Sequence, residues 1–229
     1  MKYAMKPTMN PSPDPRRSAV LGLRMAVALV VACGLSGRVL GGEAAPDQGV
    51  LRAQPSLGEL RKTEQLIAAA KDGDPQVQYI LGVCYQVGRG VRKDPGEALK
   101  WFAKAAAQGF ADAEYELGCC FNGEEGCARD SAEAVRWWGR AANQGHAEAQ
   151  YCLALSYFAG EGTAKSPAEA AKWWRKAAEQ NHPDAQYYLG LCYSLGLGVP
   201  PAKTQAIFWL RKALASGNGD ALALLAKLK

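Results

Sequence analysis

The chain has 229 residues, of which 48% are hydrophobic and 21% charged, and this length and composition fit one sizeable globular domain. Its formal net charge is +5, but residues 1–33 carry five basic residues and one acidic residue, so that residues 34–229 are almost neutral. This near-neutrality gives no case for nucleic acid as a partner, and none is expected.

The first 33 residues have the features of an export signal. A basic, proline-containing segment precedes the uncharged stretch 25–37, which is shorter than the ~20 residues of a membrane span and typical of a secretory signal. Val30-Val-Ala-Cys33-Gly34 resembles a bacterial lipobox, in which Cys33 would be lipid-modified, and Arg16-Arg17 resembles a twin-arginine signal. Plain secretion, with Cys33 an incidental residue of the signal core, and an uncleaved anchor remain open as alternatives.

The signal predicts an exported protein in the periplasm or cell envelope. It would touch the membrane only through an N-terminal lipid or an uncleaved anchor. Residues 34–55 contain glycine and proline without hydrophobic periodicity, and we interpret them as a linker. The folded domain is then expected to cover residues 56–229.

Within residues 56–229 the sequence repeats every 36 residues. Several columns keep this period, the clearest being Trp101, Trp137, Trp173 and Trp209. Four units follow, at about 74–109, 110–145, 146–181 and 182–217. A partial unit flanks them on each side, at 57–71 and 220–229. Self-similarity at this period is the sequence signature of a solenoid.

Each unit predicts two helices. In the first unit, Asp74-Pro75 supplies a helix N-cap followed by proline at the first helical position, and Gly88 ends that helix. Asp94 and Glu97 form a capping box for the second helix, which Gly109 ends. The rings of Trp101 and its equivalents are expected to fill the space between the two helices of a unit. The fourth unit has Pro200-Pro201-Ala-Lys in place of a cap.

One helix pair cannot bury both of its faces, so the units must stack. The predicted fold is all-α: an α/α superhelical solenoid of four 36-residue helix-pair repeats with a capping helix at each end. The segment 57–71 matches a second helix of the repeat and 220–229 matches a first helix.

The repeat resembles the Sel1-like repeat family of the tetratricopeptide-like superfamily. The strings that carry the resemblance are AEYELGCCF, AQYCLALSY and AQYYLGLCY for the first helix, GRGVRKD for the loop and EALKWFAKAAAQG for the second helix. The family implies a superhelix that binds proteins or peptides, often as an adaptor. The loops at 123–127 and 160–163 depart from the usual Gly-x-Gly-Val, and weaker loop packing is expected there.

Residues for catalysis are sparse. The motifs Gly-x-Ser-x-Gly, Ser-x-x-Lys, the phosphate loop and His-Glu-x-x-His are absent from the sequence. His146 and His182 lie one period apart, just after helix ends, and are expected to cap helix starts. We therefore expect no enzyme activity, no cofactor and no metal site. The alternative is a cell-envelope hydrolase of the β-lactam or cell-wall type, but the cysteine pair of the corresponding family branch is replaced here by Ala106 and Glu114.

The cysteines of the repeat allow two interpretations. Cys84, Cys120 and Cys192 share one column on the expected buried face of the first helix, where a small residue suits close packing. Cys127 stands in the second loop near Cys119 and Cys120, and a local disulfide from Cys127 to one of these two is a candidate in an oxidising compartment.

A partner is expected on the concave face of the solenoid, which first helices line in this superfamily. The resemblance places there Tyr79, Tyr115, Tyr151 and Tyr187, with Leu155 and Leu191 one turn further along. Tyrosine combines broad apolar contact with a hydroxyl at low entropic cost. The alternative is that the tyrosines only pack between neighbouring first helices. The expected function is an exported scaffold or adaptor that binds a protein or peptide.

Overall fold

The computed structural model of the protein describes residues 57–123 and 128–228. All regular secondary structure in these residues is helical. The helices are α2 (Leu57–Lys71), α3 (Pro75–Val87), α4 (Pro95–Ala107), α5 (Ala111–Phe121), α6 (Ser131–Asn143), α7 (Ala147–Ala159), α8 (Pro167–Glu179), α9 (Pro183–Leu195), α10 (Lys203–Ala215) and α11 (Asp220–Lys227).

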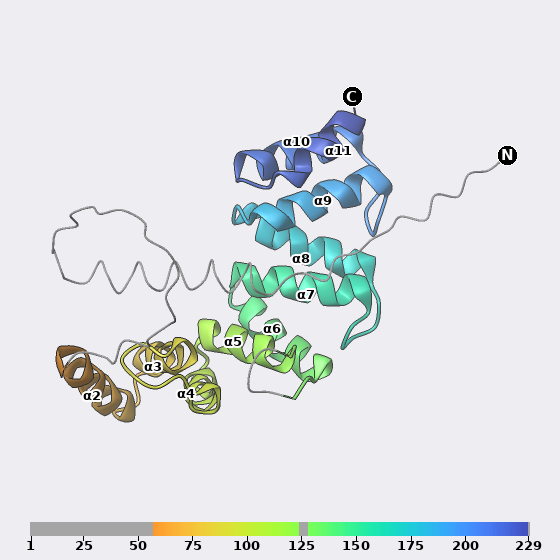
Figure 1. The fold of residues 1–229 in the computed structure, drawn as a ribbon. Coiled ribbons are helices and arrows are strands. Elements are labelled where there is room, and N and C mark those ends of the chain that lie inside the picture. Colours follow the sequence, from red (N-terminus) through yellow and green to blue (C-terminus); the bar gives the residue numbers. More distant parts are fainter. Residues whose placement is uncertain (1–56, 124–127, 229) are drawn as a thin grey trace, which may run out of the picture. The chain divides into compact units, whose positions relative to one another are not determined.

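Each described helix packs against the helices that precede and follow it in the chain. Figure 1 shows the resulting stack, in which α3/α4, α5/α6, α7/α8 and α9/α10 are the four helix pairs. Contacts of each unit with its neighbouring units are the property that defines a solenoid. The all-α solenoid with a helix at each end is therefore confirmed. The helix pairs begin and end within a residue or two of the predicted units.

Local capping chemistry fixes the helix starts. The Asp74 carboxylate accepts hydrogen bonds from the backbone N–H groups of Gln76 and Val77, and Asp94 accepts one from Glu97. Asp130 and Ser166 cap α6 and α8 in the same way. The cap of α10 falls on Ala202, which supplies no side-chain hydrogen bond, as its Pro-Pro-Ala-Lys sequence predicts.

The loop inside each unit has one recurring backbone hydrogen bond. The N–H of the second helix's N-cap donates to the carbonyl of the aromatic residue near the end of the first helix, from Asp94 to Tyr85 at 2.9 Å in the first unit. The equivalent bonds join Asp130 to Phe121, Ser166 to Tyr157 and Ala202 to Tyr193. This bond closes a loop of fixed length and explains why the spacing of 36 residues does not drift.

The third loop keeps the regular backbone despite its unusual sequence. Gly160 and Gly162 have φ of 77° and 70°, close to the 72° of both Gly196 and Gly198. A Cβ atom added to Gly162 would lie within 3.0 Å of the Ser131 backbone at the start of α6. The expectation of weaker packing is therefore wrong for this loop. Its counterpart at 123–127 falls largely outside the described residues.

The space inside a helix pair is filled by the residue after the predicted tryptophan. Trp138 is 6% exposed, and a Cβ on Gly118 of α5 would lie within 3.0 Å of its indole ring. Phe102 meets Gly82, and Leu210 meets Gly190, in the same way. A missing side chain on the first helix thus makes room for a large one on the second.

The predicted column of tryptophans packs between units instead. Trp137 is only partly buried and contacts the core cluster formed by α4 and α5, which includes Phe102 and Leu117. Trp101 packs in the same sense on Ala70 of α2. The expectation that Trp101 and its equivalents fill the space within a unit is corrected: they join each unit to the one before it.

Candidate partner-binding face

The predicted tyrosine column lies largely inside the structure. Tyr115 and Tyr151 are only 9% and 6% exposed, and burial raises the pKa of each phenol. Tyr79 and Tyr187 remain partly exposed. The exposed role predicted for Tyr115 and Tyr151 is therefore corrected, because a ring buried this deeply presents almost no surface to a partner.

A ring from the next unit covers each of the first three tyrosines. His146 stacks on Tyr115 with ring centroids 4.7 Å apart, and His182 stacks on Tyr151 at 4.6 Å. Phe110 takes the same place against Tyr79 at 5.4 Å. The residue at the start of each of these first helices thus covers the tyrosine of the preceding first helix. Tyr115 and Tyr151 therefore pack between neighbouring first helices, which is the alternative to a role in partner binding.

Both histidines cap helices, as predicted. The Nδ1 of His146 accepts the backbone N–H of Ala149, and the Nδ1 of His182 accepts that of Ala185, both at 3.2 Å. Their Nε2 atoms lie 3.2 Å from Asp112 and 3.1 Å from Glu148. Both ring nitrogens of each histidine are thus engaged by groups of the chain itself.

The two predicted leucines are the apolar part of the face that stays accessible. Leu155 on α7 and Leu191 on α9 are both partly exposed and occupy one register of neighbouring units. Tyr187 lies one turn before Leu191 on the same helix and is also partly exposed. We call these three residues, together with Tyr79 on α3, the first-helix face.

A buried polar ladder runs beneath this face. Gln78 and Gln150 donate through Nε2 to the backbone carbonyls of Ala70 and Ala142, in each case at the end of the preceding second helix, at 3.2 and 3.1 Å. The carbonyl Oε1 of Gln150 in turn accepts from Gln180 at 2.8 Å. The ladder joins successive units through hydrogen bonds between buried groups, where an unpaired polar group is costly.

The second unit replaces the ladder glutamine by a carboxylate. Glu114 is 1% exposed and lies 2.7 Å from the Arg140 guanidinium, and it accepts a 2.6 Å hydrogen bond from Gln144. Arg140 also donates to the carbonyl of Ala106 at 3.2 Å, the bond that a glutamine would have made. Burial raises the pKa of Glu114, while the charge of Arg140 and the hydrogen bonds from Gln144 and Arg140 lower it, and burial dominates.

Glu114→Gln is expected to abolish one pH dependence of stability. Because the pKa of Glu114 is higher in the folded than in the unfolded chain, the wild type loses stability as pH rises through the folded-state pKa. The variant has no proton to lose there. Its free energy of unfolding minus that of the wild type should therefore increase from about pH 4 upward and then level off. Urea denaturation at a series of pH values measures this difference.

Gln150→Glu is the matched control, since it places a carboxylate in the same ladder position of the third unit, where Lys176 replaces the arginine. It should destabilise the protein at neutral pH by about 1–3 kcal/mol. If the free energy of unfolding of Glu114→Gln minus that of the wild type instead falls with rising pH, Arg140 lowers the pKa of Glu114 more than burial raises it.

The repeat columns of the sequence contain a signal for the contact between Glu114 and Arg140. Glutamine is interrupted at Glu114 and lysine is interrupted at Arg140, and both interruptions occur in the same unit. Two exceptions to a repeat that coincide in one unit indicate a contact between the exceptional residues. Neither column reveals the contact when it is considered alone.

The structure separates the disulfide candidates. Cys120 is disulfide-bonded, whereas Cys119 keeps its thiol and is buried. The predicted partner, Cys127, lies outside the described residues, so the pairing stays a prediction. In the core column Cys192 is 1% exposed, and burial raises the pKa of its thiol to about 12, which keeps it protonated at neutral pH.

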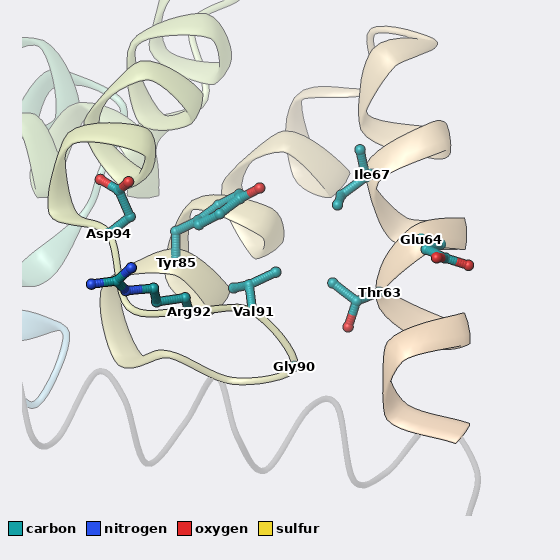
Figure 2. Close-up of a pocket in the computed structure, with 8 residues that line it drawn as sticks. All are labelled: Thr63, Glu64, Ile67, Tyr85, Gly90, Val91, Arg92 and Asp94. Carbon is teal, nitrogen blue, oxygen red and sulfur yellow. The ribbon is translucent and has the colours of Figure 1, made fainter. Parts of the chain in front are cut away.

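A pocket of about 350 Å³ lies between α2 and the loop that joins α3 to α4. Figure 2 shows Ile67, Tyr85 and Val91 pointing toward one another across it, while Glu64 points away. The pocket therefore lies at the contact between the capping helix α2 and the first unit. In the described part of the chain, no group of three or more His, Cys, Asp or Glu side chains is placed to hold a metal ion.

None of the helices in residues 57–228 combines the length and the apolarity that crossing a bilayer requires. The signal segment with its lipidation candidate Cys33 and the linker 34–55 lie outside the described residues, and their roles stay predictions.

Comparison with known proteins supports the repeat at the level of sequence and structure. The Sel1 repeat model matches residues 75–110, 111–146, 147–182 and 183–218. A Sel1 repeat protein from Oxalobacter formigenes has a similar structure, with a TM-score of 0.70 and 38% identity over 75% of this chain and 49% of that one. A protective antigen of uropathogenic Escherichia coli with an SLR fold has a TM-score of 0.68 and 38% identity over 69% of this chain and 34% of its own.

The curated relatives are similar over a short stretch. DAP3-binding cell death enhancer 1 of Mus musculus is 38% identical over 73 residues, which are 28% of this chain and 14% of that protein. The chain thus spans a small part of that relative and half or less of the two solved structures. Sel1 repeat proteins are helical-repeat scaffolds for protein interaction. With four matched repeats that cover most of its length, this chain belongs to the Sel1 repeat family.

Proposed function

We propose that this protein is an exported scaffold or adaptor that binds a protein or peptide along its first-helix face. The observation that carries the proposal is the accessible apolar register of Leu155 and Leu191 on neighbouring first helices. Apolar side chains that share one register on neighbouring helices can supply the apolar core of an interface. The stacked tyrosine–histidine pairs and the polar ladder fix the helices beneath these leucines, so binding would cost little ordering entropy.

The experiment is capture of partners from an envelope extract by the immobilised chain. Leu155→Asp combined with Leu191→Asp is expected to weaken retention of a specific partner at least tenfold, since truncating a hot spot typically costs ~2 kcal/mol or more. Phe208→Asp is the matched control, because Phe208 is 48% exposed but lies on a second helix. Circular dichroism checks that both variants stay folded. Equal loss of retention in the control, or full retention by the double variant, would contradict the proposal.

Export is the second part of the proposal, and it rests on the basic and apolar pattern of residues 1–37. Cleavage at or near Cys33 is expected when the protein is made in a bacterial host. Intact mass decides this: lipid modification adds the mass of the acyl groups to a chain that begins at Cys33, and plain secretion gives an unmodified shorter chain. An unprocessed full-length species in the cytosol would contradict export.

A further inference from the structure

The two ends of the helical stack are complementary halves of one repeat. α2 stands in the register of a second helix, since Ala69 and Ala70 lie one period before Ala105 and Ala106. α11 stands in the register of a first helix, since Ala221 lies one period after Ala185. Within the described residues no first helix precedes α2 and no second helix follows α11. Figure 1 shows these two helices at opposite ends of the stack.

The α11 end exposes positions that every complete unit buries. Leu222 is 61% exposed, whereas the residues at its position in the four units are between 1% and 6% exposed: Gln78, Glu114, Gln150 and Gln186. Leu225 is partly exposed, while its equivalents are at most 3% exposed: Leu81, Leu117, Leu153 and Leu189. Leu222 and Leu225 therefore form an accessible apolar surface of the kind that a second helix covers inside a complete unit.

The α2 end shows the reciprocal exposure. Ala69 is partly exposed, although its equivalents are 0% exposed in all four units: Ala105, Ala141, Ala177 and Ala213. Leu66 is likewise partly exposed, although its equivalents are at most 6% exposed: Phe102, Trp138, Trp174 and Leu210. Ile67, the next residue, lines the pocket between α2 and the loop that joins α3 to α4. The face of α2 that a first helix would cover is therefore open.

The side chains at the two ends match as they do inside a unit. In three of the units, the large residue equivalent to Leu66 packs against a glycine of its own first helix. The position of that glycine is Ala154 in the third unit and Ala226 in α11, so a small residue is available at the α11 end. Ala226 is exposed. One end therefore has the large side chain and the other has the space for it.

We propose that the chain associates head to tail with a second copy of itself, α11 of one copy packing against α2 of the next. The pair would form a composite repeat and would continue the alternation of first and second helices from one copy into the other. This interface would have the same form as the contact between the two helices of one unit, which occurs four times in the chain, from α3 with α4 to α9 with α10. Such an interface uses two different surfaces, so it propagates into a ring or a filament rather than ending at a dimer.

The contact between α11 and α2 joins one helix of each copy and is therefore small. We expect a dissociation constant in the micromolar range or weaker, and the test extends to about 1 mM protein.

The test is sedimentation equilibrium of the full chain across that concentration range. The mean mass is expected to rise above that of the monomer. Leu222→Glu at the α11 end and Ala69→Glu at the α2 end should each weaken self-association at least tenfold. An equimolar mixture of the two variants should recover a one-to-one dimer that grows no further, because each variant keeps the end that the other lacks. Phe208→Glu, on the exposed side of a second helix, should leave association unchanged.

Several outcomes would overturn the proposal. A wild-type chain that is monomeric up to about 1 mM would show that the ends are covered within one copy, for example by residues 1–56. Loss of association in Leu222→Glu but not in Ala69→Glu would indicate an interface between two α11 helices. If circular dichroism shows that Leu222→Glu perturbs α11, Ala226→Arg, at an exposed position of the same helix, replaces it in the mixing experiment.

Discussion

Trp138→Ala is expected to lower the free energy of unfolding by about 3–5 kcal/mol, the cost of removing a large side chain from a packed core. Trp138 is 6% exposed and lies in a cluster with Tyr115, Ala134 and Leu153. Gly118 leaves the room into which its ring fits. Because a glycine cannot expand into the vacated space, the variant would keep most of the cavity.

Trp137→Ala is the matched comparison, since it removes the same side chain one residue earlier. Trp137 is partly buried, and the Arg140 guanidinium lies 4.6 Å from the centre of its ring. We expect it to cost about half as much or less. Equilibrium urea denaturation followed by circular dichroism compares the two variants. Equal costs would mean that the contact between units is as tightly packed as the interior of a helix pair.

Gly162→Ala is expected to destabilise the protein by about 3 kcal/mol or more. Two effects add at this position. The φ of 70° is unfavourable for any residue with a Cβ, which costs about 1–2 kcal/mol. The new Cβ would also lie within 3.0 Å of the carbonyl of Ser131 and the N–H of Ala132. Those atoms belong to the backbone at the start of α6, so they cannot move aside as a flexible side chain would.

Gly145→Ala separates these two effects. Gly145 has a φ of 96° but no atom within 4 Å of the position that a Cβ would take. Its substitution should cost only the conformational part, about 1–2 kcal/mol. Thermal and urea denaturation of both variants provide the comparison. A cost for Gly162→Ala no larger than that for Gly145→Ala would show that the third loop does not press on the second unit.

Because the units contact only their neighbours, the effects of Trp138 and Gly162 also report on different contacts. Trp138 stabilises the interior of the second unit, whereas Gly162 stabilises the contact of the third unit with the second. Stability in such an array is approximately a sum of terms within units and terms between them. The double variant should therefore lose close to the sum of the two single losses.

The helices and their order follow from local signals in the sequence. Asp74, Asp94 and Ser166 cap helices through bonds to backbone groups two or three residues away, and Gly160 ends a helix through its own φ. These interactions are local, so they can be read from a window of a few residues. The period of 36 residues then gives the number of units. The period is constant because a loop of the same length joins the two helices in every unit.

Which face of each helix packs against which neighbour depends on contacts between distant residues, and local signals do not specify it. A second helix packs on the first helix of its own unit and on the first helix of the next unit, and Trp137 packs on the α4/α5 cluster. Trp137 and Trp138 therefore both lie on apolar stripes, and periodicity cannot rank them. The burial of Tyr115 likewise depends on His146, 31 positions away in the next unit. Such contacts depend on how the units stack, and the stacking is fixed by the packing of side chains across units rather than by the local signals that start and stop each helix.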